Sequence, residues 1–430
     1  MKINNKIAVI GLGYVGLPLS VEFSKYFKVV GFDINKNRIS ELQNGIDKTK
    51  TIINSKYLKS KNLSFSDNTN LIKDCNIYII TVPTPIDNAN RPDLSYLKNA
   101  SETVGNLLNI EDMVIYESTV YPGLTEEFCI PILAKKSKLI INKDFFCGYS
   151  PERLNPGDEK NTLKKIPKII SSNSKQGLKL MEGLYGKIID SGLHKTSSIK
   201  VAEASKVIEN CQRDINIAFV NELSIIFKRL NIDTKEVLEA AKTKWNFLPF
   251  SPGMVGGHCI GIDPYYLTHK AEQLGYIPQM ILSGRRINDS MAKFSSRNIL
   301  QLMVKNKIDI GSSKVGILGV TYKENCPDLR NSKVLDLINE LKSWNVEIQI
   351  VDEWVDPKEL EYYNYKCVKF KDLSDLDAIV VAVGHNEFKK LKPNDFKKLC
   401  KKKSQPVLSD LKSIYEKKTF ENAGFSVFRL

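Results

Sequence analysis

The feature that most constrains the fold is a short apolar run near the N-terminus that leads into a glycine-rich turn. Residues 6–10 (KIAVI) are apolar and mostly β-branched, which is typical of a strand buried on both faces of a parallel sheet. Similar runs follow at 28–32, 77–82 and 113–117, with helical patterns beginning near Pro18, Lys36 and Tyr96. Strands that alternate with helices predict βαβ units in a doubly wound α/β sheet.

The middle of the chain has a different texture. Residues 199–230 carry apolar side chains at helical spacing without Gly or Pro, which predicts one long helix. A second helix is predicted at 234–243, a Pro- and Gly-rich loop at 247–264 and a further helix at 291–305. A long amphipathic helix between two α/β regions suits dimerisation, although it could equally belong to a core.

From residue 314 the α/β pattern returns, with the apolar runs KVGILGVTY, EIQIVD and AIVVAVG and a helical pattern at 333–344. At about 150 residues per domain, 430 residues suggest two or three domains. We expect two Rossmann-like doubly wound domains, 1–198 and 306–430, joined by a central helical domain at 199–305.

The glycine turn itself has the form G-x-G-x-x-G, from Gly11 through Tyr14 and Val15 to Gly16. In such a turn the first glycine allows the tight bend, the second (Gly13) lets a pyrophosphate approach the backbone, and the third lets the helix pack on the strand. Asp33 closes the next apolar run, where a carboxylate can bind ribose hydroxyls. These residues predict a dinucleotide site. Asp33 would repel a 2′-phosphate and favours NAD over NADP, although Lys36 and Arg38 lie nearby.

Cysteine usage and charge bound the setting of the protein. The eight cysteines are scattered without a C-x-x-C pair, and the four histidines are well separated, so we expect reduced thiols and no metal site. No run of about 18 apolar residues is present, so we expect a soluble, cytoplasmic protein without a membrane span. The net charge of +14 is compatible with nucleic acid, an anionic membrane or small acidic ligands. The chain has no basic low-complexity arm and no aromatic RNA-binding motif, which favours small anions.

Three loops and one helix face carry further candidate chemistry. Cys259 lies in a glycine-rich loop with Asp263 four positions later, and is either a nucleophile or a buried structural thiol. Lys206 and Asn210 share a helix face at i,i+4, and a lysine can lower a thiol pKa or stabilise an oxyanion; a solvated surface lysine is the plainer alternative. The remaining loops are ESTVYPG at 117–123 and YSPERLNPG at 149–157, where Glu152 is a possible general base or simply an exposed acid.

Taken together, the motifs AVIGLGYVGLPL, TVPTP, ESTVYPG, SPERLNPG, KVIEN, GGHCIGIDP and YKENCPDLR resemble the UDP-glucose/GDP-mannose dehydrogenase family in the same order over essentially the whole chain. The resemblance implies a four-electron, NAD-dependent oxidation of a sugar C6 alcohol to a carboxylate. It implies that Cys259 captures the C6 aldehyde as a thiohemiacetal, which is oxidised to a thioester and released by water.

The same resemblance implies the remaining site residues. Lys206 and Asn210 would support the oxyanion, Asp263 and Thr119 would position water or relay protons, and Glu152 would assist as a base. The residues implied in NAD binding, beyond Gly11, Gly13, Tyr14, Val15, Gly16 and Asp33, are Arg38, Thr84, Thr119 and Arg330. The residues implied in substrate binding are Glu152, Arg153, Leu154, Lys206, Asn210, Phe250, Gly253, Gly256, His258 and Lys323.

Two departures from the UDP-glucose enzymes bear on the substrate. Arg153-Leu154-Asn155-Pro156-Gly157 stands where those enzymes carry Phe-Leu-(Arg/Ala)-Glu-Gly, and His258 stands where they have Ser. Both features resemble the branch that acts on UDP-N-acetylhexosamines. Within that branch, residues 207–234 and 244–270 closely resemble the Vi-antigen type UDP-N-acetylglucosamine 6-dehydrogenases. The alternatives are the galacto or manno sugar, UDP-glucose or GDP-mannose, and a non-catalytic NAD or nucleotide-sugar sensor. We expect a homodimer that serves surface polysaccharide synthesis, as for a capsule or lipopolysaccharide O-antigen.

Overall fold

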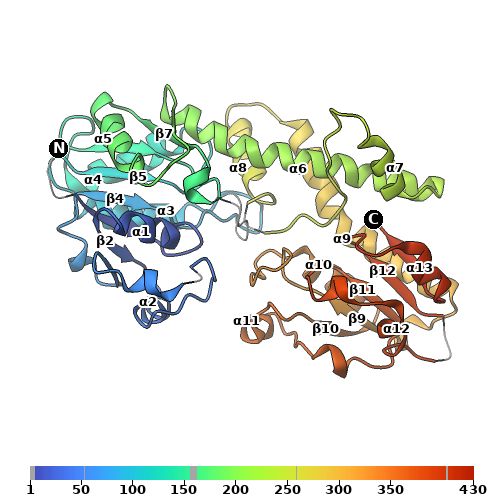
Figure 1. The fold of residues 1–430 in the computed structure, drawn as a ribbon. Coiled ribbons are helices and arrows are strands. Elements are labelled where there is room, and N and C mark those ends of the chain that lie inside the picture. Colours follow the sequence, from blue (N-terminus) through green and yellow to red (C-terminus); the bar gives the residue numbers. More distant parts are fainter. Residues whose placement is uncertain (1–4, 53, 155–161, 258, 403–404) are drawn as a thin grey trace. The chain divides into compact units, whose positions relative to one another are not determined.

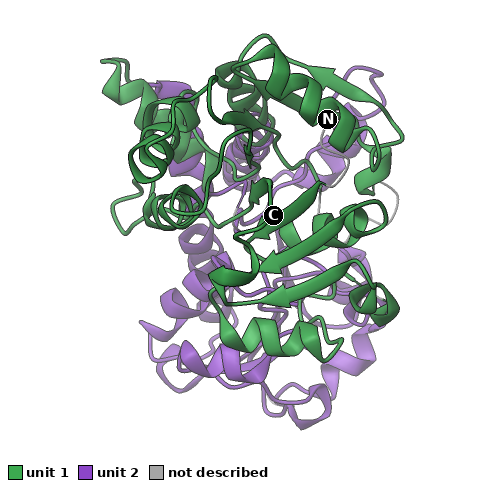
Figure 2. Ribbon diagram, turned by 90° about the vertical axis from the view of Figure 1, so that its left-hand side faces the viewer, with its two compact units in different colours: residues 1–210, 262–277 green, residues 211–261, 278–430 purple. Residues whose placement is uncertain are grey.

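The computed structural model describes residues 5–52, 54–154, 162–257, 259–402 and 405–430 (Figure 1). The chain divides into two compact units, shown in different colours in Figure 2. Unit 1 comprises residues 1–210 and 262–277, and unit 2 comprises residues 211–261 and 278–430. The long helix α6 (Ile199–Leu230) begins in unit 1 and ends in unit 2. We describe each unit by itself.

Unit 1 is built on an eight-stranded sheet with the order β3-β2-β1-β4-β5-β6-β7-β8, in which β6 and β7 pair antiparallel and the other neighbours pair parallel. Its strands are β1 (Lys6–Ile10), β2 (Lys28–Phe32), β3 (Leu63–Ser66), β4 (Ile77–Ile80), β5 (Met113–Tyr116), β6 (Phe146–Tyr149), β7 (Lys168–Ser172) and β8 (Leu193–Lys195). Its helices include α1 (Gly16–Ser24), α2 (Lys36–Gln43), α3 (Ser95–Gly105), α4 (Ile130–Ser137), α5 (Lys175–Tyr185) and α8 (Asp263–Gln273).

The sheet of unit 1 is buried on both faces. Ala8 and Ile10 of β1 pack into one apolar cluster, and Ile7 and Val9 of the same strand pack into another. Successive side chains of a strand point to opposite faces, so an unbroken apolar run is needed when helices cover both of them. This arrangement confirms the doubly wound fold expected from the N-terminal runs.

Unit 2 contains a five-stranded, all-parallel sheet with the order β10-β9-β11-β12-β13. Its strands are β9 (Lys314–Leu318), β10 (Glu347–Val351), β11 (Ala378–Val381), β12 (Val407–Asp410) and β13 (Ser426–Arg429). Its helices include α7 (Thr234–Ala241), α9 (Gln279–Lys305), α10 (Lys333–Lys342), α11 (Pro357–Tyr362), α12 (Pro393–Lys397) and α13 (Lys417–Asn422). Val315 and Ile317 join one apolar cluster and Leu318 joins another, so this sheet is also covered on both faces.

The central helices differ from the sequence prediction in two places. The helix expected at 291–305 begins twelve residues earlier, at Gln279, and runs through Gly284. A glycine lowers helix propensity, but this one faces Ala218 and Ile215 of α6, where a small residue permits close packing. The loop expected to last until residue 264 ends at Asp263, where α8 begins with proline in its first turn, a position that proline tolerates. Among the described residues, no helix combines the length and apolarity needed to cross a membrane.

Candidate functional site

The glycine turn of unit 1 has the geometry that the motif requires. Gly11 has φ +95° and donates its N–H to the Phe32 carbonyl at 2.8 Å, which ties the turn to the end of β2. A Cβ at Gly16 would collide with the Gly11 carbonyl and with the Thr81 hydroxyl, whereas a Cβ at Gly13 would meet nothing within 4 Å. The first and third glycines therefore serve packing, and the second leaves open space beside the backbone.

The open space faces groups that suit a pyrophosphate and a ribose. Helix α1 begins at Gly16, and no side chain caps its N-terminus, so the positive end of the helix dipole can attract an anion. The Leu17 N–H donates to the Gly13 carbonyl at 3.3 Å, and Pro18 has no N–H. Asp33 Oδ2 accepts the Leu12 N–H at 2.8 Å, and its Oδ1 accepts the Asn35 N–H at 2.9 Å. Each carboxylate oxygen keeps a further lone pair for a ribose hydroxyl. The residues present fit NAD.

The other predicted cofactor residues of unit 1 lie on the same edge of the sheet or beside it. Thr84 and Thr119 are half-buried in the segments after β4 and β5, two neighbouring strands whose carboxyl ends share one edge. Tyr14 and Val15 are half-buried within the turn. Arg38 is engaged inside the protein, since its Nε donates to the Leu12 carbonyl at 3.0 Å and its Nη2 pairs with Asp47 at 2.9 Å.

Glu152 is buried and held at both carboxylate oxygens. Its Oε1 accepts the N–H groups of Arg153 and Leu154 at 2.6 and 2.7 Å, and its Oε2 lies 3.2 Å from Lys168 Nζ. Lys168 Nζ is also 2.7 Å from Glu117, which accepts the hydroxyl of Tyr185. Burial lowers the pKa of Lys168, but the two carboxylates outweigh it and raise that pKa. The lysine therefore stays charged and fixes Glu152, which is not an exposed acid.

Arg153 and Leu154 extend this loop. Arg153 pairs with Glu209 on α6 at 2.7 Å and donates to the Pro167 carbonyl at 3.1 Å. Leu154 packs against the apolar cluster on one face of the sheet. The rest of the predicted motif, Asn155, Pro156 and Gly157, lies outside the described residues.

Three predicted catalytic side chains come together within unit 1. Lys206 and Asn210 are buried on α6, and Asp263 is buried in the first turn of α8. Asn210 Nδ2 donates to Asp263 Oδ2 at 2.5 Å. Burial raises the pKa of Asp263 to about 6, although the charge of Lys206 and the Asn210 hydrogen bond lower it in part. The i,i+4 pair is therefore a buried polar group and not a solvated helix face.

Glu203, one turn before Lys206 on α6, is a site-supporting residue that the sequence analysis missed. Its carboxylate accepts the N–H groups of Gly123 and Thr125 at 2.5 and 2.9 Å, and so fastens the ESTVYPG loop that carries Thr119. Burial raises the pKa of Glu203 to about 7, against the lowering effect of hydrogen bonds from this loop. The signal in the sequence was the position of Glu203 on the apolar side of the predicted amphipathic helix, where an acid needs a partner.

Unit 2 carries the cysteine loop. Gly257 has φ +82°, donates its N–H to the Asn331 carbonyl at 3.2 Å and packs on the Tyr322 ring, while a Cβ at Gly256 would collide with the same carbonyl. Cys259 follows and is exposed, in contrast to the mostly buried cysteines of the described residues. This exposure argues against a buried structural thiol. His258 lies outside the described residues.

The start of this loop is fixed from α6. The side-chain amide of Asn221 donates to the Gly253 carbonyl at 3.0 Å, and its Oδ1 accepts the Gly253 N–H at 2.8 Å. The same amide reaches Asn288, which bonds to Asp214, and Asp214 pairs with Arg285 at 2.6 Å. Phe250 is half-buried three residues before Gly253. A buried polar network, also missed from the sequence, therefore sets the position of the loop.

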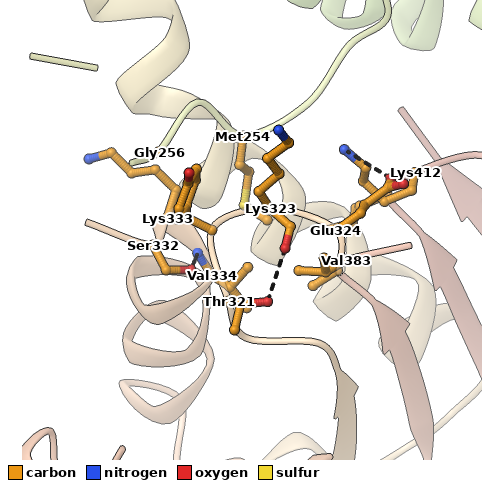
Figure 3. Close-up of a pocket in the computed structure, with 13 residues that line it drawn as sticks. Met254, Gly256, Thr321, Lys323, Glu324, Ser332, Lys333, Val334, Val383 and Lys412 are labelled. Carbon is orange, nitrogen blue, oxygen red and sulfur yellow. Dashed lines mark hydrogen bonds and ion pairs between the residues drawn. The ribbon is translucent and has the colours of Figure 1, made fainter. Parts of the chain in front are cut away.

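A cavity of about 300 Å³ lies in unit 2 (Figure 3). Its lining includes residues that follow β9, β11 and β12, which is the carboxyl edge where parallel sheets usually bind ligands. Lys323, Lys333 and Lys412 contribute positive charge, with Glu324 as an acid, and Met254 and Gly256 bring the cysteine loop to the wall. Lys333 is also held by Asp289 and Asp336 at 3.3 and 2.9 Å. This composition suits a phosphate-bearing ligand.

The turn after β9 repeats the backbone geometry of the first glycine turn. Gly319 has φ +86° and donates to the Val351 carbonyl at 2.8 Å, and Asp352 Oδ2 accepts the Val320 N–H at 2.8 Å. Here, however, His385 Nε2 lies 3.2 Å from the same Oδ2, and both side chains are buried. Arg330, predicted to contact NAD, bonds to Asp328 at 2.8 Å in this unit, and its contact with NAD stays a prediction.

The structure therefore brings Lys206, Asn210 and Asp263 together in unit 1, where Glu152 also lies. It places Gly253, Gly256, Cys259, Lys323 and Arg330 in unit 2. Among the described residues, no group of three or more His, Cys, Asp or Glu side chains forms a metal site. The dinucleotide turn indicates NAD, and the basic cavity indicates a phosphorylated substrate. Together with the buried Lys206–Asn210–Asp263 group, these features are those of an NAD-dependent dehydrogenase.

Comparison with known proteins gives the family. The chain belongs to the UDP-glucose/GDP-mannose dehydrogenase family, whose NAD binding, central and UDP binding domains match residues 5–189, 200–290 and 316–417. It is thus an NAD-dependent nucleotide-sugar dehydrogenase.

Individual relatives cover nearly the whole chain. A UDP-N-acetyl-D-glucosamine 6-dehydrogenase of Salmonella typhi is 54% identical over 95% of this chain and 96% of its own length. One of Pseudomonas aeruginosa is 51% identical over 96% and 97%. The structure of a UDP-D-ManNAc dehydrogenase from Pyrococcus horikoshii is 30% identical, covers 99% of this chain and 98% of its own, and has a TM-score of 0.89.

Proposed function

We propose that this protein oxidises the C6 hydroxyl of a UDP-N-acetylhexosamine, UDP-N-acetylglucosamine before UDP-N-acetylgalactosamine, to the uronic acid for surface polysaccharide synthesis. The observation that carries the proposal is the buried Lys206–Asn210–Asp263 group, which lies in the same unit as the dinucleotide turn, in a chain 54% identical to an enzyme named for that substrate. NAD, when bound, supplies the hydride acceptor for two successive oxidations.

The side chains divide the work as follows. The thiol of Cys259 adds to the C6 aldehyde, so that a carbon–sulfur bond forms and the carbonyl oxygen becomes a hydroxyl. After the second oxidation a thioester remains, and water cleaves its carbon–sulfur bond to release the carboxylate and the thiol. Lys206 and Asn210 stabilise the negative charge that develops on oxygen, and Asp263 with Thr119 orients water or accepts its proton.

Other residues bind and orient. Glu152 is already hydrogen-bonded at both oxygens, which suits orientation of the sugar and its surrounding loop more than free proton transfer. Arg153 and Leu154 follow Glu152 in the same loop and are proposed to bind substrate with it. Phe250 and His258 belong to the proposed substrate-binding set by their resemblance to the family. Lys323, with Lys333 and Lys412, offsets the charge of the UDP phosphates.

A homodimer is part of the proposal. Helix α6 exposes Val201, Ile208, Phe219, Ile226 and Leu230, whose spacings of 7, 11, 7 and 4 place them on one face. An apolar stripe of this length suits a second copy of the same helix. A cytoplasmic setting is also part of the proposal.

The test is an assay of NADH release with UDP-N-acetylglucosamine, UDP-N-acetylgalactosamine, UDP-N-acetylmannosamine, UDP-glucose and GDP-mannose in parallel. We expect the highest kcat/KM with UDP-N-acetylglucosamine and two NADH for each sugar acid. A higher kcat/KM with UDP-glucose or GDP-mannose would contradict the substrate. Stabilisation by NAD without NADH formation from any sugar would favour a sensor.

A further inference from the structure

The guanidinium of Arg38 contacts the glycine turn of unit 1, and Asp47 holds it there. Leu12 is gripped from two sides, since Asp33 accepts its N–H at 2.8 Å and Arg38 Nε donates to its carbonyl at 3.0 Å. The carboxylate that binds ribose and the guanidinium that could bind a 2′-phosphate therefore contact the same residue. What decides their roles is how each of them is held.

Asp47 is the central acceptor of a local hydrogen-bond network. Its side chain is 1% exposed, and its oxygens accept N–H groups from Thr49 and Ile52 and hydroxyls from Thr49 and Thr51 at 2.7 to 3.1 Å. Burial raises the pKa of Asp47, but these hydrogen bonds and Arg38 outweigh it and lower that pKa overall. The carboxylate is thus a fixed, ionised anchor.

The anchor leaves Arg38 little freedom. Arg38 Nη2 lies 2.9 Å from Asp47 Oδ1 and 3.4 Å from Thr49 Oγ1, and the Arg38 side chain is only 10% exposed. A guanidinium that meets a phosphate bidentately needs two N–H groups in one plane free to turn outward. Here Nε and Nη2, the pair on one edge of the guanidinium, are both occupied within the protein.

We propose that Asp47 is a determinant of cofactor specificity, because it withholds Arg38 from the 2′-phosphate of NADP. Preference for NAD then rests on two separate elements. Asp33 repels the 2′-phosphate, and Asp47 keeps neutralised and immobile the cation that would otherwise attract it. Arg38 serves the turn as a support for the Leu12 carbonyl.

The experiment measures the Kd of NADP⁺ and of NAD⁺ by titration calorimetry, with the melting temperature as a check on folding. In the Asp33→Ser background, Asp47→Asn is expected to tighten NADP⁺ binding by about tenfold, or ~1.4 kcal/mol. Adding Arg38→Gln should abolish that gain. Asp144→Asn is the matched control, since Asp144 also caps a backbone N–H at 2.8 Å but is remote in sequence from Arg38. It should change neither Kd.

Two outcomes would overturn the proposal. One is NADP⁺ binding in Asp33→Ser/Asp47→Asn that is no tighter than in Asp33→Ser, and the other is a gain that survives Arg38→Gln. Should the Asp47 variant unfold, Arg38→Gln in the Asp33→Ser background still decides. Loss of the support for the Leu12 carbonyl weakens NAD⁺ and NADP⁺ alike, so the ratio of the two Kd values should stay within about twofold if Asp47 withholds the guanidinium from the phosphate. A selective loss of NADP⁺ affinity would show that Arg38 already reaches the phosphate.

Discussion

Asn210 donates a hydrogen bond of 2.5 Å to the buried carboxylate of Asp263, and this contact joins α6 to the first turn of α8. Burial raises the pKa of Asp263 to about 6, while Lys206 and Asn210 each lower it. The ionised form therefore predominates only above that pH. Because the proposed role of Asp263 needs the carboxylate, the kcat should fall as pH drops through about 6.

Asn210→Ala tests this relationship. Without the hydrogen bond to its charged form, the pKa of Asp263 rises, so the acid limb of the pH–kcat profile should move to higher pH by roughly half a unit or more. Asp263→Asn should cost roughly 10²- to 10⁴-fold in kcat, the usual size of a lost proton-transfer group. A limb that stays in place or moves to lower pH in Asn210→Ala would contradict the assignment.

Cys259→Ala should abolish the release of two NADH per sugar, because no thiol remains to hold the aldehyde. Cys400→Ala is the control, since that half-buried thiol donates to the Phe396 carbonyl of helix α12 in unit 2. Mass spectrometry of the quenched enzyme should detect a sugar adduct on the wild-type chain and none on Cys259→Ala. Undiminished turnover in Cys259→Ala would exclude the covalent scheme.

Alanine at the third glycine of the dinucleotide turn should lower stability, whereas alanine at the second glycine should lower NAD affinity. Gly13→Ala places its Cβ in open space, so the melting temperature should hardly change while NAD affinity falls at least tenfold, because the methyl occupies the pyrophosphate path. Gly16→Ala drives its Cβ into backbone, so it should unfold at markedly lower temperature. Equal effects of the two variants on stability, measured by calorimetry, would refute this division.

Asn221→Ala removes both hydrogen bonds that hold Gly253 and leaves its partly buried N–H and carbonyl without these partners. An unpaired buried group costs about 1–3 kcal/mol, so the cysteine loop should loosen. We expect the KM for the sugar nucleotide to rise several-fold, whereas the Kd of NAD, bound in unit 1, should not change. Asn216→Ala, on the same helix with only a local bond to Gln212, should leave both values unchanged.

Glu203 should make stability depend on pH near neutrality. Its pKa of about 7 in the folded protein lies above its ordinary value of 4.5, so its stabilising contribution is complete below about pH 4.5 and is lost as pH rises through 7. Glu203→Gln cannot ionise. Its melting temperature relative to wild type should therefore improve between pH 5 and pH 8. No such trend, or the same trend in the control Glu222→Gln, which changes an exposed acid on the same helix, would contradict this origin.

Local pattern was sufficient for most of the fold. The bounds of α6 and β1 match those expected from apolar periodicity, and the positive φ of Gly11 follows from the motif. The supporting residues were missed because their partners are distant in sequence. Glu203 meets Gly123 across 80 residues and Lys168 meets Glu117 across 51, and no local period encodes such contacts. The start of α9 was missed because Gly284 has low helix propensity, although it lies within the helix and faces Ala218 and Ile215 of α6.

Asp352, the acid beside the second glycine turn, bears on how one chain binds two different nucleotides. Asp33 and Asp352 end equivalent strands and grip equivalent amides, but His385 satisfies the second of them within the fold. A carboxylate consumed in this way has nothing left to offer a ribose. The chain can therefore contain the same strand–glycine turn twice, with only the turn of unit 1 keeping a carboxylate that can bind the ribose of NAD. The turn of unit 2 does not compete for the coenzyme.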